Sequence, residues 1–252
     1  IEVIKDRGFS KLSEVQQQAI PKILNGDNLL LIAPTGTGKT ESAMIPVLSG
    51  MLAGEGKGFT TLYITPLRAL NRDILRRMEW WCQNLGLTIG VRHGDTSQAE
   101  RRKQVLHPPD LLITTPETIQ ALFMGKRLRE HLRSVKYVIV DEIHDIAGTK
   151  RGAQLVIALE RLARYAGEFQ RIGLSATVGN PEEIARFLTG DRPCSIVEVP
   201  VAKLLDINVE LAGEKFESQV QAIRRHTGKG PSTLIFVNTR STAESLGHAL
   251  LK

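Results

Sequence analysis

The chain has 252 residues, of which 42% are apolar and 24% are charged, and its formal net charge is +6. These values are ordinary for a globular protein with a substantial core, and the mild basic excess gives weak support for a polyanionic partner. Cys82 and Cys194 are isolated, which argues against a zinc cluster and a disulfide framework and makes a reducing cytoplasm the expected compartment. No apolar run approaches the roughly 20 residues of a membrane span, so we expect no membrane partner.

Short apolar runs alternate with helical patterns along the chain. Strands are predicted at 28–33, 60–65, 87–91, 110–115, 136–140, 171–175, 195–199 and 233–237. Helices are predicted after a capping box at Ser13 and Gln16, and then at 38–53, 68–83, 97–106, 151–166, 180–188, 214–227 and the C-terminal end. Most runs are continuously apolar, as in strands buried on both faces. The alternation predicts an α/β fold with a mainly parallel sheet flanked by helices.

The segment 191–215 interrupts this alternation with two prolines and two successive strand-like pieces. It predicts a boundary near 200–205, with one domain over 1–202 and the beginning of a second over 203–252. The chain opens on Ile1 and closes in a helical pattern without a stop signal. We therefore expect it to be part of a longer polypeptide.

Five predicted strands are followed directly by polar or turn-forming residues. The segments are "PTGTGKT" (34–40), "PLRAL" (66–70), "TPET" (115–118), "DEIH" (141–144) and "SAT" (175–177). Parallel strands end at the same edge of their sheet, and open α/β sheets bind ligands outside that carboxyl edge. We expect these segments to converge along one rim.

The run "APTGTGKT" (33–40) has the core of a phosphate-binding loop. Gly36 and Gly38 let the backbone N–H groups turn inward to cradle phosphate oxygens, and Lys39 adds a cation. Thr40 opens the next helix and offers a hydroxyl to Mg²⁺. The strict pattern has glycine where Ala33 stands. The alternative is a plain glycine turn before a helix with a surface lysine, which the strand before and the helix after disfavour.

The interpretation of the acidic run 141–144 depends on the glycine-rich loop. Beside it, Asp141 at the end of an apolar strand is typical of a carboxylate that holds Mg²⁺ opposite Thr40, and Glu142 can polarise an attacking water. An exposed acidic turn is the alternative without the loop. A zinc site that includes His144 is disfavoured because the spacing is not H-E-x-x-H and the segment is predicted as a strand end.

The remaining segments are uninformative when each is taken singly. By itself "SAT" is a turn, and the Thr-Pro pairs at 65–66 and 115–116 are strand terminators. Arg68 and the basic run 101–103 are expected on solvated helix faces, and Gln16 is expected on the surface.

Taken in chain order, these segments resemble the motifs of superfamily 2 helicases of the DExH type. The matches are Gln16, "APTGTGKT" (33–40), "TPLRAL" (65–70), "GD" (94–95), "TTPE" (114–117), "DEIH" (141–144), "SAT" (175–177) and "LIFVNTR" (234–240). The runs 141–162 and 171–193 are similar to the large helicase-related (Lhr) group, a branch near the Ski2-like helicases. The resemblance implies a RecA-like P-loop NTPase domain and the start of a second RecA-like domain.

The resemblance also implies a role for each matching residue. ATP binding would involve Gln16, which recognises adenine, and Thr35, Gly36, Thr37, Gly38, Lys39 and Thr40. Thr40 and Asp141 would hold Mg²⁺, and the catalytic residues would be Glu142 as general base, Asp141 and Lys39. Coupling between the nucleotide and the nucleic acid would involve His144, Ser175 and Thr177. The nucleic-acid track would consist of Pro66, Arg68, Gly94, Asp95, Thr115, Pro116 and Glu117. Such contacts to the phosphodiester backbone give little sequence specificity and a strong salt dependence.

The implied function is that of an ATP-dependent helicase or translocase, moving 3′-to-5′ on single-stranded DNA, with RNA or an RNA–DNA hybrid as other candidate substrates. The family needs a second RecA-like domain with arginine fingers, and an arginine finger is worth about 10³–10⁵ in rate. We expect the chain alone to bind nucleotide but to hydrolyse it very slowly and not to unwind.

Two other functions stay open. One is a nucleic-acid clamp that senses ATP without turnover, which a positioned Glu142 disfavours for the complete protein. The other is a different P-loop ATPase such as a transporter motor, which the absence of an LSGGQ sequence disfavours. Contacts to phosphate and sugar leave both DNA and RNA open as the partner.

Overall fold

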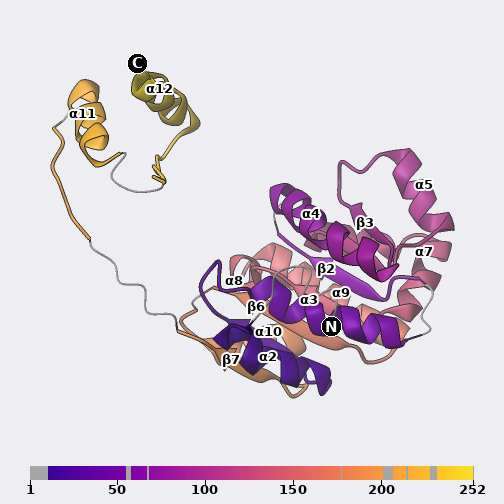
Figure 1. The fold of residues 1–252 in the computed structure, drawn as a ribbon. Coiled ribbons are helices and arrows are strands. Elements are labelled where there is room, and N and C mark those ends of the chain that lie inside the picture. Colours follow the sequence, from indigo (N-terminus) through magenta and orange to yellow (C-terminus); the bar gives the residue numbers. More distant parts are fainter. Residues whose placement is uncertain are drawn as a thin grey trace. The chain divides into compact units, whose positions relative to one another are not determined.

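The computed structural model divides into two compact units, Ile1–Val201 and Ala202–Lys252 (Figure 1). It describes residues 11–54, 58–66, 68–176, 178–200, 207–213, 215–227 and 232–251, and for residues 68–73 it describes the backbone alone. The division lies close to the boundary expected from the two prolines and strand-like pieces after residue 190.

The first unit is built on a seven-stranded sheet in which every pairing is parallel. Its strands are β1 (Leu29–Ile32), β2 (Thr61–Ile64), β3 (Ile89–Arg92), β4 (Leu111–Thr114), β5 (Tyr137–Val140), β6 (Gln170–Ser175) and β7 (Ser195–Glu198). Their spatial order is β3-β4-β2-β5-β6-β1-β7. The central strands are buried on both faces, which explains their continuous apolar sequences.

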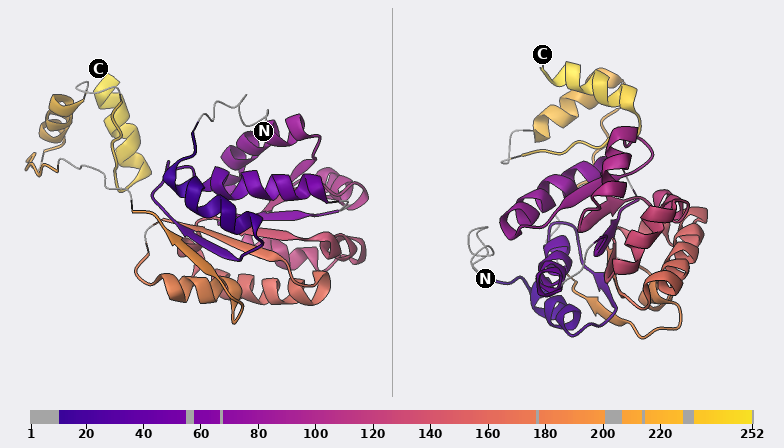
Figure 2. Two further views of the ribbon diagram at one scale, coloured as in Figure 1. Left: turned by 60° about the horizontal axis from the view of Figure 1, so that its bottom comes forward. Right: turned by 90° about the vertical axis from the view of Figure 1, so that its right-hand side faces the viewer.

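Helices cover both faces of the sheet (Figure 1 and Figure 2). Alternate residues of a strand point to opposite faces, so Leu29 and Leu31 of β1 join one core and Leu30 and Ile32 join the other. The first core includes α2 (Glu14–Leu24), α3 (Lys39–Ala53) and α4 (Arg68–Leu85). The second includes α6 (Pro116–Leu122), α7 (Lys126–His131), the 3₁₀ turn η1 (Leu132–Ser134), α8 (Ile143–Ile146), α9 (Lys150–Ala166) and α10 (Pro181–Thr189). Val105 of α5 (Gln98–Leu106) packs against this second core.

The predicted fold class is confirmed, and the first seven predicted strands lie within one or two residues of their expected positions. The short helices α6, α7 and α8 were not predicted. They have four to seven residues each, too few for the 3.6-residue periodicity that marks a helix in a sequence.

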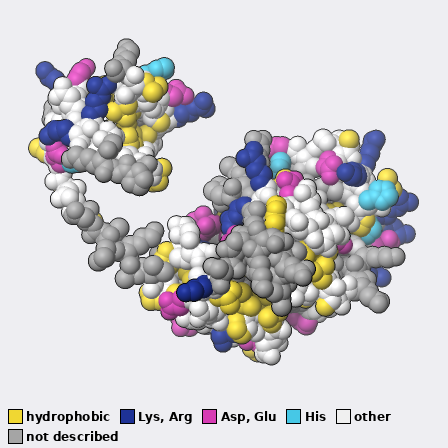
Figure 3. All heavy atoms as spheres, viewed as in Figure 1, with side chains coloured by type: hydrophobic (Ala, Val, Ile, Leu, Met, Phe, Trp, Pro, Cys, Tyr) yellow, Lys and Arg dark blue, Asp and Glu magenta, His cyan; other side chains and the backbone are white. Residues whose placement is uncertain are grey.

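The second unit contains two described helices, α11 (Phe216–His226) and α12 (Arg240–Leu251). The strand predicted at 233–237 is wrong, because these residues form no strand in the described part of the chain. Leu234 and Phe236 are 83% and 89% exposed, and Figure 3 shows apolar side chains gathered on the surface of this unit. A strand is stable only when a neighbouring strand pairs with it, and no other segment described in this unit supplies one.

None of the described helices is both long enough and apolar enough to cross a membrane.

We predict that Gly152→Ala destabilises the first unit. A Cβ added at Gly152, near the start of α9, would lie 2.1 Å from the carbonyl oxygen of Ile146 and 2.9 Å from the ring of Phe187. A backbone carbonyl cannot swing aside as a flexible side chain does, so we expect a loss of about 1–3 kcal/mol in the free energy of unfolding. Calorimetry should show a melting temperature lower by several degrees. Gly179→Ala is the control, since nothing lies within 4 Å of its added carbon, and equal stability of the two variants would contradict the prediction.

Candidate functional site

The carboxyl ends of the parallel strands bring the predicted segments to one rim, in an order that the strand order dictates. From β3 to β1 the rim carries Gly94–Asp95, Thr115–Glu117, Pro66, the acidic run 141–144, Ser175 and then the glycine-rich loop. The segments therefore fall into two groups. The first group, with the phosphate-binding and coupling candidates, follows β5, β6 and β1, and the second group, with the candidates for a nucleic-acid track, follows β3, β4 and β2.

The glycine-rich loop adopts a conformation that its glycines permit. Gly36 and Gly38 have φ angles of 81° and 89°, in the left-handed region that side chains rarely occupy. Gly38 is the N-cap of α3, so Lys39 begins the helix and the N-terminal N–H groups face the loop. Glu142 is the one non-glycine residue with a positive φ in the described part of the chain. Ala33 is therefore outside the left-handed region, which explains why alanine is accepted there.

Lys39 is buried against the loop that it follows. Its Nζ donates to the carbonyl oxygen of Ala33 at 2.5 Å, and 7% of the residue is exposed. Burial lowers the pKa of Lys39, while the negative charges of Glu142 and Asp141 oppose that shift. The lysine and the two carboxylates are thus near enough to interact electrostatically, although about a hundred residues separate them in the chain.

Asp141 is a buried carboxylate that is held at both oxygens. The hydroxyl of Tyr63 donates to its Oδ2 at 2.6 Å, and the backbone N–H of Glu142 donates to its Oδ1 at 3.0 Å. Burial raises the pKa of Asp141, and the hydrogen bond from Tyr63 opposes that shift. Burial, followed by the charge of Asp141, also raises the pKa of Glu142. The two carboxylates lie side by side in a poorly solvated place.

Glu142 has a strained backbone, with φ 45° and ψ 46°. Left-handed geometry costs a non-glycine residue energy and often marks functional sites. The strand stops at Val140, so Asp141 follows a strand end as expected, but Ile143 begins the helical turn α8, which was not expected.

Gln16 is buried, contrary to the surface position expected from its segment alone, with 3% exposed. The predicted capping box is present: the Ser13 hydroxyl accepts from the Gln16 N–H, and Gln16 Oε1 accepts from the Ser13 N–H. The Ser13 hydroxyl also donates to the carbonyl of Thr37 at 3.2 Å. A Cβ added at Gly38 would lie 3.1 Å from Gln16 Nε2. The capping box therefore packs directly on the phosphate-binding loop.

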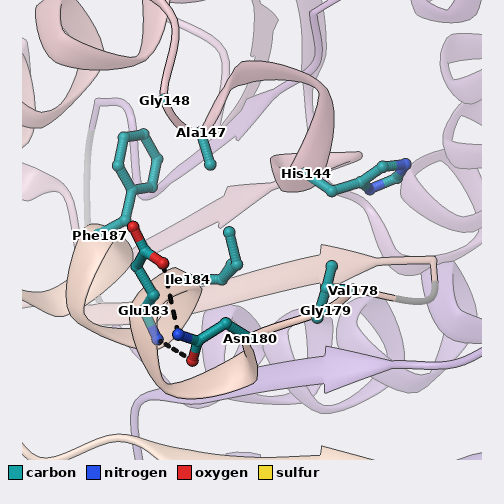
Figure 4. Close-up of a pocket in the computed structure, with 9 residues that line it drawn as sticks. All are labelled: His144, Ala147, Gly148, Val178, Gly179, Asn180, Glu183, Ile184 and Phe187. Atoms are coloured by element: carbon teal, nitrogen blue, oxygen red, sulfur yellow. Dashed lines mark hydrogen bonds between the residues drawn. The ribbon is translucent and has the colours of Figure 1, made fainter.

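His144 contacts the end of the neighbouring strand. Its Nδ1 lies 3.1 Å from the hydroxyl of Ser175 and accepts from the N–H of Ala176 at 3.4 Å. Two of the three predicted coupling residues therefore touch each other, and Thr177, the third, lies outside the described residues. A cavity of about 370 Å³ lies beside His144, between α8 and the start of α10 (Figure 4). Asn180 and Glu183 in its wall hydrogen-bond each other as a helix cap.

The candidate track residues lie at or just beyond the ends of β3, β4 and β2. Gly94 and Asp95 form the turn after β3, Thr115 is the N-cap of α6, and Pro116 is its first residue. Arg68 begins α4, and its side chain lies outside the described residues.

Two arginines that the sequence analysis did not assign to the track hydrogen-bond to its segments. Arg151, at the start of α9, donates to the carbonyl oxygen of Pro66 at 2.7 Å and pairs with Glu117. Arg101 donates to the carbonyl oxygens of His93, Gly94 and Thr96. The expectation that the basic run 101–103 is simply a solvated helix face is therefore wrong for Arg101.

Tyr63 is the other functional candidate that the sequence analysis missed. It lay inside a predicted buried strand, where an aromatic residue is ordinary, and no pattern in the sequence marks its hydroxyl. A polar atom in a strand that is buried on both faces is the signal that could have drawn attention to it.

The residues present fit a magnesium–nucleotide complex. Among the described residues no three His, Cys, Asp or Glu side chains are grouped to bind a metal. Mg²⁺ is usually held by one or two protein oxygens and otherwise by water and phosphate oxygens. The carboxylate of Asp141 and the hydroxyl of Thr40 are such hard oxygen donors, and Tyr63 hydrogen-bonds to Asp141 and lies near Thr40.

We predict that Asp141→Asn raises the melting temperature at pH 8. Because burial raises the pKa of Asp141 in the folded state, its ionised form destabilises the fold at high pH, and this penalty disappears as pH falls through the raised pKa toward the unfolded value of about 3.9. Asparagine carries no charge and keeps an oxygen that accepts from Tyr63. Thermal scans should show the gain at pH 8 and little difference near pH 4. Asp191→Asn, at an exposed position, should change little at either pH.

Comparison with known proteins is consistent with this geometry. The DEAD/DEAH box helicase family model matches residues 13–184. The ATP-dependent helicase Lhr-Core of Methanothermobacter thermautotrophicus is 39% identical over 278 residues, covering 97% of this chain and 32% of that protein. The Lhr helicase/probable uracil glycosylase of Mycolicibacterium smegmatis is also 39% identical, covering 94% of this chain and 17% of that protein. The chain thus spans about a third or less of the length of these relatives.

Solved structures show the same fold. The structure of Mycobacterium smegmatis helicase Lhr bound to ssDNA and AMP-PNP aligns with 99% of this chain and 35% of that chain, with a TM-score of 0.84 and 38% identity. The DEAD-box helicase Mss116, bound to ssRNA and UDP-BeF, is 21% identical with a TM-score of 0.70 over 78% of this chain, a likeness of fold alone. The predicted resemblance to superfamily 2 helicases, and within them to the Lhr group, is confirmed by these relatives. The chain belongs to the DEAD/DEAH box helicase family.

Proposed function

We propose that the chain is the ATP-binding part of an ATP-dependent helicase or translocase that moves along single-stranded nucleic acid. The observation that carries the proposal is the meeting of Lys39, Asp141 and Glu142 at one rim, where each carboxylate acts electrostatically on the lysine. A phosphate-binding lysine close to two carboxylates is the arrangement that phosphoryl transfer from a nucleotide requires.

Each residue of this group has a separate task in the proposal. Lys39 and the N–H groups of residues 35–40 bind the phosphates, and Gln16, packed on the same loop, contacts the adenine. Thr40 and Asp141 hold Mg²⁺, which neutralises charge on the phosphates when bound. Glu142 takes a proton from the attacking water. Its raised pKa makes it a stronger base than an exposed glutamate, and bases are most effective when their pKa approaches the working pH.

The second half of the rim is the proposed nucleic-acid track. Its residues are Pro66, Arg68, Gly94, Asp95, Thr115, Pro116 and Glu117. The related Mycobacterium smegmatis helicase Lhr has been solved bound to ssDNA, which supports single-stranded DNA as the first substrate to test. We propose 3′-to-5′ movement, with RNA and RNA–DNA hybrids as further substrates. The contact of His144 with Ser175 supports their role, with Thr177, in transmitting the nucleotide state to the track.

We further propose that residues 203–252 begin a second RecA-like domain, which completes the site. Leu234, Ile235 and Phe236 form an apolar run with exposed fractions of 83%, 38% and 89%. Exposed contiguous apolar residues favour a missing packing partner. The relatives are about three to six times as long as the part matched, which leaves room for such a domain. The two unpaired cysteines favour a cytoplasmic protein.

We predict that nucleic-acid-stimulated ATP hydrolysis requires Glu142 and Lys39 in a protein extended through the second domain. Glu142→Gln should lower kcat by about 10²–10⁴ because it removes the general base, while nucleotide affinity is retained. Lys39→Ala should abolish nucleotide binding. The assay is phosphate release with and without single-stranded DNA, and duplexes with 3′ or 5′ tails report polarity.

The control for that experiment is Glu182→Gln, which removes an exposed carboxylate in the first turn of α10 that belongs to neither group of the rim and should leave kcat unchanged. The 252-residue chain by itself should hydrolyse ATP about 10³-fold or more slowly than the extended protein, because it lacks the arginine finger. Binding of ATP and DNA without turnover in the extended protein would refute the helicase proposal and identify a clamp.

We predict that Arg151→Met weakens binding of single-stranded DNA without changing nucleotide affinity. The arginine holds the Pro66 carbonyl and Glu117 together, so its loss frees two segments of the track. A positioning loss of about 1 kcal/mol corresponds to roughly a fivefold change in Kd, measurable by fluorescence anisotropy. Arg161→Met, on the same helix but bonded to Gln120, is the matched control. If the two variants bind DNA with equal affinity, Arg151 does not position the track.

A further inference from the structure

Tyr63 has a fully buried hydroxyl in the middle of the candidate site. The residue is 0% exposed and its ring belongs to the core that α3 and α4 cover. Parallel pairing sets Tyr63 of β2 beside Ile139 of β5. Side chains two residues apart lie on the same face of a sheet, so the side chain of Asp141 lies on the same face as that of Ile139. The tyrosine side chain can therefore extend along that face to the rim and meet Asp141.

The hydroxyl lies between two oxygen groups of the site. It donates to Asp141 Oδ2 at 2.6 Å, and the Thr40 side chain lies near it. A tyrosine phenol has an ordinary pKa of about 10, so the hydroxyl keeps its proton and is a donor at physiological pH. With the Glu142 N–H on Oδ1, each oxygen of Asp141 has one protein donor that fixes the plane of the carboxylate.

We propose that Tyr63 is a positioning residue for magnesium: its hydroxyl orients the Asp141 carboxylate. The inference rests on the proposed function, in which Asp141 and Thr40 hold the ion. Mg²⁺ demands nearly ideal octahedral geometry, so a ligand free to rotate binds it less well. Groups that hydrogen-bond to metal ligands orient them, and their loss typically weakens metal affinity about 10–100-fold. A phenylalanine would fill the same space without a hydroxyl to orient the Asp141 carboxylate.

The test is a magnesium titration of mant-ATP binding to the chain, followed by fluorescence, with EDTA as the metal-free reference. Tyr63→Phe should raise the Mg²⁺ concentration for half-maximal tightening by about 10–100-fold and leave the affinity for mant-ATP in EDTA unchanged. In an Asp141→Asn background, Tyr63→Phe should add little, because the tyrosine acts through that carboxylate. Such non-additivity distinguishes positioning from general stabilisation.

Tyr137→Phe is the matched control. Tyr137 begins β5, at the end of the strand opposite to Asp141, and its hydroxyl lies against Gly50. It should show the wild-type titration. A wild-type magnesium requirement in Tyr63→Phe, or an equal loss of affinity with and without the metal, would overturn the role of Tyr63 alone. A wild-type chain whose mant-ATP binding ignores Mg²⁺ would overturn the proposed function and this inference together.

Discussion

The parallel sheet is the constraint on which the rest of the structure depends. Every strand in a parallel sheet ends at the same edge, so residues that are far apart in the chain meet there without any direct pairing between their own segments. Lys39 follows β1 and Asp141 follows β5, yet the two interact because β6 alone stands between those strands. The strand order further separates the rim into a phosphate-binding group and a track group. A different order of the same strands would scatter the same motifs.

The phosphate-binding group concentrates features that oppose folding. Lys39 and Asp141 are each 7% exposed, and burying charges costs free energy unless partners compensate. Glu142 adds left-handed backbone strain and a second carboxylate next to the first. Sites of this kind persist when the surrounding structure holds them in place and when their chemistry is needed. The apolar strands and the two helical layers supply that support, since the strands that carry the site are almost fully buried.

Helices and strands that show a local sequence pattern could be predicted from the sequence. Continuous apolar runs marked β1 to β7, and the capping box at Ser13 and Gln16 marked the start of α2. Side-chain contacts across the sheet are different in kind, because nothing local in "TTLYIT" indicates that Tyr63 reaches Asp141, and nothing in "TKRG" indicates that Arg151 binds Pro66 and Glu117. The run 233–237 has the composition of a strand, but composition cannot supply the neighbour that a strand requires.

Strand β2 joins the two halves of the rim. Tyr63 extends from it to Asp141 in the phosphate-binding group, and three residues later the carbonyl of Pro66 accepts from Arg151 in the track. Arg151 lies in the first turn of α9, the helix that follows α8, and α8 carries His144. Contacts therefore connect the acidic run to Pro66 in two ways. One passes through Tyr63 and along β2, and the other passes through α8 to Arg151. Contacts of this kind can couple two sites when they include an element that has two arrangements and when both sites shift the equilibrium between them. The end of β2 lies between the two groups of the rim, because β2 is hydrogen-bonded to β5 on one side and to β4 on the other.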